Sequence, residues 1–191
     1  MLPASQNVGP RCWLHLLTTA IFGLALIVGG HFVWAAETLS IADFVGHFRG
    51  EAQVQAGDRF FIQQLRDTEV DLRVESDGFR LRWDTVIHYD LGDTSKVRRR
   101  DTEMRFVSGP KSNQFHTLEP LEPFTEKPVA WAHIDGKTLV VHVLSILADG
   151  NYELQTYERS LSGDTMTLFF SRVFPGRPEL FVSGKLTRQA E

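Results

Sequence analysis

The chain has a single cysteine among its 191 residues, Cys12. One thiol cannot form an internal disulfide, so burial of an apolar core must stabilise the folded part. Basic residues are also few, because 20 lysines and arginines stand against 24 aspartates and glutamates, for a formal net charge of −4. This balance leaves no cationic excess to hold a phosphate backbone. We therefore expect no nucleic acid partner.

The sequence also lacks the motifs of metal sites and of nucleophilic hydrolases. No His-x-His or His-x-x-x-His spacing indicates zinc, and His88 with Asp90 and Asp93 is typical of turn chemistry. No Gly-x-Ser-x-Gly elbow places a serine nucleophile between a strand and a helix. The sequence thus predicts no metal site and no catalytic residue, and an enzyme is not the favoured class.

The N-terminal segment is almost without charge. Arg11 is the only charged residue before Glu37, and an apolar stretch follows it over 13–34. Val33-Trp34-Ala35 at its end fits the small-x-small rule for cleavage after Ala35. This pattern predicts a cleavable signal segment over 1–35. Retention is the alternative, because about 20 apolar residues suffice to span a bilayer as an inner-membrane anchor. In either case we expect residues 36–191 to be periplasmic or secreted.

The rest of the chain alternates between apolar and polar residues with period two. Turn residues interrupt this pattern roughly every eight to twelve positions, which is typical of an all-β sandwich or barrel. We count about ten strands, preceded by one short helical turn at Ser40–Val45. An antiparallel up-and-down barrel accommodates such strands without exposed edges. Residues 36–191 are therefore expected to form a single barrel domain.

Turn residues predict how the strands pair. Asp-Gly and Gly-Asp pairs supply the positive φ angles of two-residue hairpin turns. Four of these pairs predict the hairpin turns that set the register: Asp77-Gly78, Asp135-Gly136, Asp149-Gly150 and Gly163-Asp164. If each pair forms the turn itself, the opposed residues are Leu72 with Trp83, Trp131 with Val140, His142 with Tyr157, and Tyr157 with Phe170.

This predicted register gathers aromatic side chains on one face of the sheet, with Arg159 at one end of the patch. Apolar walls with a few polar groups are the profile of a ligand pocket, although aromatic patches in barrels also serve packing alone. The pattern leaves open which face is interior. Arg100 is a further candidate because a guanidinium can bind a carboxylate in bidentate geometry, unless it is a solvated strand end. The candidate ligand-binding residues are Trp83, Arg100, Trp131, His142, Tyr157 and Phe170.

The first strand carries a family resemblance. The segment Gly46-His47-Phe48-Arg49-Gly50-Glu51 resembles the opening of calycin-superfamily barrels, and among these it is most similar to the nitrobindin-type ten-stranded domains. The resemblance implies a lipocalin-like barrel with an interior ligand. Haem-binding members use a histidine near the C-terminal strands, and this chain has none after His142, so we expect no haem and no other cofactor. Fatty-acid-binding barrels use Arg-x-Tyr on the last strand, whereas Arg188 is followed by Gln189 and Ala190.

Three functional hypotheses follow. The first is an exported, non-catalytic calycin-like barrel that binds a small hydrophobic or amphipathic molecule. The second is an envelope structural or protein-interaction module with a solid, packed barrel. The third is an enzyme that uses His142 and Tyr157 as an acid–base pair. A cavity of roughly 300 Å³ or more separates the first hypothesis from the second. Contact with a membrane is expected only through the N-terminal segment, if it is uncleaved.

Overall fold

The structure is a computed structural model, and it describes residues 38–56, 65–89, 97–118 and 127–190. The predicted signal or anchor over 1–35 lies outside these residues and stays a prediction. Within the described ranges, no helix is long and apolar enough to cross a membrane.

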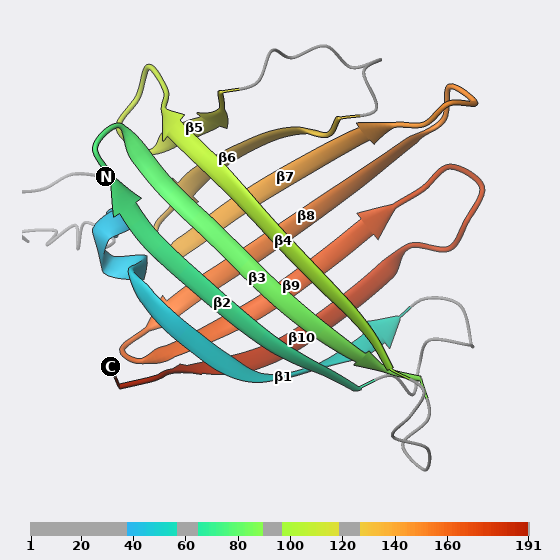
Figure 1. Ribbon diagram of the computed structural model, residues 1–191, viewed down its shortest axis with the longest axis horizontal. Helices are drawn as coiled ribbons and strands as arrows, with labels where there is room; N and C mark the ends of the chain where they lie inside the picture. The colour runs from blue at the N-terminus through green and yellow to red at the C-terminus, as the bar shows by residue number, and fades with distance from the viewer. Residues whose placement is uncertain (1–37, 57–64, 90–96, 119–126, 191) are drawn as a thin grey trace, which may run out of the picture. The chain divides into compact units, whose positions relative to one another are not determined.

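The described residues form one closed, antiparallel barrel of ten strands (Figure 1). Each strand pairs with its neighbours in sequence, and the first strand pairs with the last. This confirms the predicted up-and-down barrel. The elements are η1 (Ile41–Phe44), β1 (Gly46–Ala56), β2 (Leu65–Glu75), β3 (Gly78–His88), β4 (Val97–Ser108), β5 (Gln114–Thr117), β6 (Val129–Asp135), β7 (Thr138–Ile146), β8 (Tyr152–Ser162), β9 (Thr165–Val173) and β10 (Leu180–Arg188).

The short turn η1 lies within the helical turn predicted at Ser40–Val45. The backbone N–H of Ser40 donates to the Asp43 carboxylate over 2.7 Å, which satisfies a group at the start of the turn. Phe44, at the end of η1, is fully buried. In Figure 1, η1 lies at the same end of the barrel as the β2–β3 and β8–β9 turns. The turn thus packs apolar side chains into that end.

The main core lies next to η1. Phe79 stacks on Phe106 with ring centroids 4.9 Å apart and meets Phe115 edge-on at 5.0 Å. These rings belong to the cluster that includes Phe44 and Phe48. A smaller cluster, formed by Ala52, Val54, Leu168, Leu180 and Val182, lines another part of the interior. The interior is therefore closely packed near η1, and a separate, smaller apolar cluster lies beyond this core.

Two predicted registers are wrong by two residues. Glu75 pairs with Gly78, so Ser76 and Asp77 form the turn and Leu72 lies opposite Leu81 in place of Trp83. The second hairpin likewise turns at Gly136 and Lys137, and Trp131 lies opposite His142 in place of Val140. A shift of two residues keeps each side chain on its face, because side chains alternate with period two.

The Asp149-Gly150 register is wrong by one residue, which has a larger effect. The connection is a five-residue loop between Ile146 and Tyr152, so His142 lies opposite Thr156 and not opposite Tyr157. An odd shift moves side chains to the opposite face. The Gly163-Asp164 register is confirmed, with Tyr157 opposite Phe170.

Glycines allow the first and last strands to close the barrel. A Cβ on Gly50 would lie 2.1 Å from the backbone oxygen of Lys185, and one on Gly184 would lie 2.4 Å from that of Glu51. Neither position admits a side chain without movement of the backbone. The β1–β10 seam thus depends on close backbone approach at both glycines.

Candidate ligand-binding cavity

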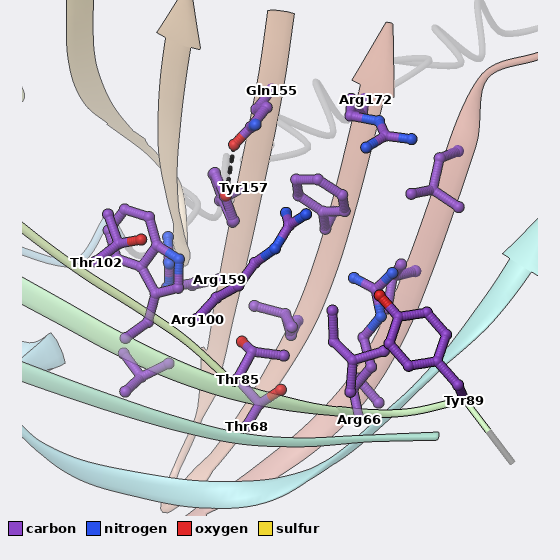
Figure 2. Close-up of a pocket in the computed structure, with 18 residues that line it drawn as sticks. Arg66, Thr68, Thr85, Tyr89, Arg100, Thr102, Gln155, Tyr157, Arg159 and Arg172 are labelled. Carbon is purple, nitrogen blue, oxygen red and sulfur yellow. Dashed lines mark hydrogen bonds between the residues drawn. The ribbon is translucent and has the colours of Figure 1, made fainter. Parts of the chain in front are cut away.

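The interior contains a cavity beyond the packed core. Its volume is about 200 Å³, and side chains from β1–β4 and β8–β10 line it. Figure 2 shows these side chains converging on the space inside the barrel. The volume is smaller than the roughly 300 Å³ expected for a ligand pocket. The interior is nevertheless not packed solid, contrary to the hypothesis of a filled barrel.

An aromatic group forms one wall of the cavity. Tyr157 on β8 lies between Trp83 and Phe170, with ring centroids 5.0 Å and 4.8 Å away. Its hydroxyl donates a 2.7 Å hydrogen bond to the Gln155 side chain, drawn as a dashed line in Figure 2. Burial raises the pKa of Tyr157, because the charged phenolate would lose its hydration. The phenol therefore stays neutral at physiological pH.

Arg159 is the most unusual residue of the cavity. Its side chain is fully buried, and its guanidinium carbon lies 5.2 Å from the ring centroids of both Trp83 and Tyr157. Its Nε and Nη1 atoms are buried without a hydrogen-bond partner. Burial lowers the pKa of Arg159 to about 10, so it remains a cation near neutral pH. The aromatic faces stabilise this cation, but they provide no counter-charge.

Three more arginines face the same cavity: Arg66, Arg100 and Arg172. Burial lowers the pKa of Arg66, and the positive charges of Arg100 and Arg172 lower it further. The described residues that line the cavity include no aspartate or glutamate. The acid Glu153, one inward position beyond Gln155, accepts a hydrogen bond from the Gln155 amide. The lining that the structure describes is therefore cationic.

The structure divides the six candidate residues into two groups. Trp83, Arg100, Tyr157 and Phe170 line the cavity. Trp131 and His142 lie on the outer face, where their rings stack at 4.9 Å and Trp131 is 38% exposed. The one-residue shift at the β7–β8 loop causes this division. The predicted patch of four aromatic residues is thus two separate groups.

The same shift removes the acid–base pair of the enzyme hypothesis. His142 contacts Thr156 on the outer face, with 3.1 Å between its Nδ1 and the hydroxyl oxygen, whereas Tyr157 faces the interior. Burial and the neighbouring His133 both lower the pKa of His142. General acid–base catalysis requires both groups to reach the reacting atoms. His142 and Tyr157 do not share a site.

Arg66 and Arg172 are cavity residues that the sequence analysis did not select. Arg172 is two positions beyond Phe170 and therefore on the same face of β9. The confirmed Gly163-Asp164 turn and the alternation of side chains along β9 together predict that Arg172 shares the face of Tyr157 and Phe170. Arg66 required knowledge that its face of β2 is interior, which the pattern left open.

Metal binding has no support among the described side chains. No group of three or more histidine, cysteine, aspartate and glutamate residues in the described ranges is placed to hold a metal ion. The predicted absence of a metal stays a prediction for the whole chain.

Comparison with known proteins identifies the fold. No family model matches the chain, and no curated protein matches its sequence. The S-type phycobiliprotein lyase of Guillardia theta is similar in structure, with a TM-score of 0.52 and 14% identity over 80% of this chain and 94% of that chain. The chain thus has the fold of the calycin-like barrels, as its first-strand motif predicts.

Two other solved structures resemble the chain more distantly. Apo lipid binding protein 8 of Caenorhabditis elegans has a TM-score of 0.35 and 10% identity, over 79% of this chain and 99% of that chain. A fatty acid transporter has a TM-score of 0.33 and 9% identity, over 78% and 98% of the two chains. Neither resemblance is close enough to carry an argument about this protein.

Proposed function

We propose that this protein is an exported, non-catalytic binding protein that holds a small, partly apolar acid in its barrel cavity. A closed barrel supports the proposal because it can separate a ligand from bulk water. The lining supports it because apolar walls are combined with a few polar groups, as in binding sites for small molecules.

The observation that carries the proposal is the buried guanidinium of Arg159, whose Nε and Nη1 atoms have no hydrogen-bond partner. Removal of a cation from water costs several kcal/mol unless an anion and hydrogen bonds compensate it. No described side chain of the cavity offers an anion. An acidic group of the ligand would supply the missing charge and accept hydrogen bonds from the guanidinium.

The cavity volume limits the size of the ligand. About 200 Å³ is more than the roughly 150 Å³ void that admits benzene in an engineered protein core. It is less than the roughly 300–1,000 Å³ of pockets for drug-sized molecules. We therefore expect a medium-chain or aromatic acid and not a long-chain lipid.

The proposal is tested by calorimetric titration of ligand-free protein with octanoate and with octanol. Octanoate should bind at least about tenfold more tightly, because a hydrogen bond to a charged group contributes about 1.5–3 kcal/mol. The variant R159M should lose this preference while it keeps the apolar volume of the side chain. R82M, on the outer face, is the matched control and should bind both probes like the wild type.

Two results would contradict the proposal. If neither octanoate nor octanol binds and native mass spectrometry of the purified protein finds no small molecule, the cavity is not a binding site for this class. If R159M binds octanoate as tightly as the wild type does, Arg159 is not the acid-binding group.

Export is a separate part of the proposal, supported by the apolar run that follows Arg11. Intact-mass measurement of protein recovered from the periplasm should show a chain that begins at Ala36. A full-length chain in the membrane fraction would favour the anchor over 13–34, and a full-length chain in the cytoplasm would contradict export.

A further inference from the structure

The cavity has two levels of positive charge, and the proposed function uses only one of them. Arg159 marks the inner level, where it lies beside Trp83. Arg66 and Arg172 mark an outer level. In Figure 2, Arg66 and Arg172 lie on one side of the view together with Tyr89, whereas Arg159 lies on the other side.

The strand register gives the distance between the two levels along the strands. Arg159 lies opposite Leu168 on β9, and Arg172 is four residues further along the same strand. At about 3.3 Å per residue, the two backbone positions differ by about 13 Å along the strand. Arg66 is likewise four residues along β2 from Val70, which pairs with Trp83. Both sides of the barrel thus place the outer arginines at the same distance from the inner level.

The outer arginines repel one another. Burial lowers the pKa of Arg66, and the positive charges of Arg100 and Arg172 lower it further. The Nε atom of Arg66 is buried without a hydrogen-bond partner. Like charges at one partly buried place are unfavourable unless an anion lies among them. The outer arginines, like Arg159, therefore require an anion, and they require it at a position separate from that of Arg159.

Apolar groups occupy one side of the wall between the two levels. Leu168 and Phe170 are the inward residues of β9 between Arg159 and Arg172, and Val182 on the adjacent β10 lies opposite Phe170. This side of the wall suits methylene or aromatic groups. On the facing side, the lining residues between the levels are polar or charged: Thr68, Thr85 and Arg100.

The geometry points to a ligand with two acidic groups, one at each end of a short apolar segment. Arg159 binds the inner acid, and Arg66 and Arg172 bind the outer acid. This inference rests on the proposed function, because it assigns a second acid to a ligand already placed in the cavity. The class is that of α,ω-dicarboxylic acids and of aromatic compounds with two opposed acidic groups.

The test compares suberate, its monomethyl ester and octanoate, which share one chain length and differ in the second acid. Calorimetric titration of the full-length mature protein should give suberate about tenfold tighter binding than the other two, as expected for one added charge-assisted contact. Adipate and sebacate, which are shorter and longer, show whether the distance between acids matters. Affinity should depend on chain length for the diacids more steeply than for the matching monoacids.

Two variants separate the levels. Arg172→Gln should reduce suberate affinity about tenfold more than octanoate affinity, and this ratio is unaffected by any loss of folded protein. Arg82→Gln on the outer face is the matched control and should leave the ratio of the two affinities as in the wild type. Arg159→Met should weaken suberate and octanoate alike.

Each outcome decides between the two ideas. If octanoate binds and suberate binds no more tightly, the second acid is wrong and the proposed function stands. If Arg172→Gln weakens both probes by the same factor, the outer arginines attract anions in general and bind no second acid. If no probe binds, the proposed function itself fails. A suberate preference that disappears in Arg172→Gln and persists in Arg82→Gln, together with equal weakening of both probes in Arg159→Met, supports the inference.

Discussion

Arginines on the two faces of the same barrel wall have opposite surroundings. On the outer face, the Arg80 guanidinium lies 2.8 Å from Glu75, and that of Arg82 lies 2.5 Å from Asp101. Arg105 lies 2.6 Å from Glu75 as well. On the inner face, Arg159 has aromatic rings beside it, and the described residues that line its cavity include no acid.

The difference separates arginines that the fold satisfies from arginines that it does not. Outer arginines have both water and cross-strand acids, so each pair adds little to stability. An inner arginine without an anion opposes folding, because its charge is removed from water. The presence of such a residue in a small barrel is understandable if an acidic group of a ligand supplies the missing anion.

The largest expected effect is on the stability of the ligand-free protein. Because R159M removes an uncompensated buried cation and keeps an apolar side chain, it should raise the free energy of unfolding by about 1–4 kcal/mol. Denaturant unfolding of ligand-free wild type and R159M measures this. A lower stability of R159M would show that Arg159 has a structural partner and would remove the contrast between the faces.

Alkaline pH should narrow the stability gap between R159M and the wild type. Burial lowers the folded-state pKa of Arg159 from its ordinary value to about 10. Below that pKa both states hold the proton and the full penalty remains. Above it the unfolded state binds more protons, so wild-type stability rises relative to R159M. Burial raises the pKa of Tyr157, which gives the opposite dependence in both proteins. Because the Arg159 charge lowers this pKa, R159M strengthens that dependence and narrows the gap further.

Substitution of an outer arginine should have a much smaller effect. The Arg82 and Asp101 side chains are 53% and 46% exposed, so R82M should change the unfolding midpoint only slightly, and less at high salt. Parallel denaturant titrations at low and high ionic strength measure this. A change as large as that of R159M would contradict the distinction between the two faces.

The smallest expected effect concerns the outer histidines. Burial and His133 lower the pKa of His142, so its protonation is less favourable in the folded state. The unfolded state therefore binds more protons as pH falls below 6.5, and stability declines there. H142Q should show a slightly weaker acid dependence between pH 5 and 7 in thermal unfolding. An equal dependence would assign the effect to other groups.

Much of the barrel could be predicted from the sequence because strands and turns leave local patterns. The alternation on β1 and the Gly163-Asp164 turn are both found as expected. Turn position was harder, since an Asp-Gly pair can form the turn or lie one residue beside it. At Asp77-Gly78 this choice changed the register by two residues and preserved the faces.

The candidate site was less predictable, because an odd or an even number of loop residues decides which side chains face the interior. The β7–β8 loop at Asp149-Gly150 has five residues in place of the predicted two. Because this difference is odd, Trp131 and His142 lie on the face opposite that of Tyr157. No local pattern states whether such a loop has two residues or five. Nor does the sequence of β8 reveal that Arg159 lacks an acid, because that follows from seven strands that together enclose it.

The β1–β10 seam has a consequence for the order of assembly. N-terminal strands leave the ribosome first, so β1 has an unpaired edge until β10 becomes available. Hairpins can form early along the meander, but contacts between segments so distant in sequence form slowly. Closure at Gly50 and Gly184 is therefore expected to be the slow step of folding. Until that step, the edge of β1 remains open to pairing with other chains.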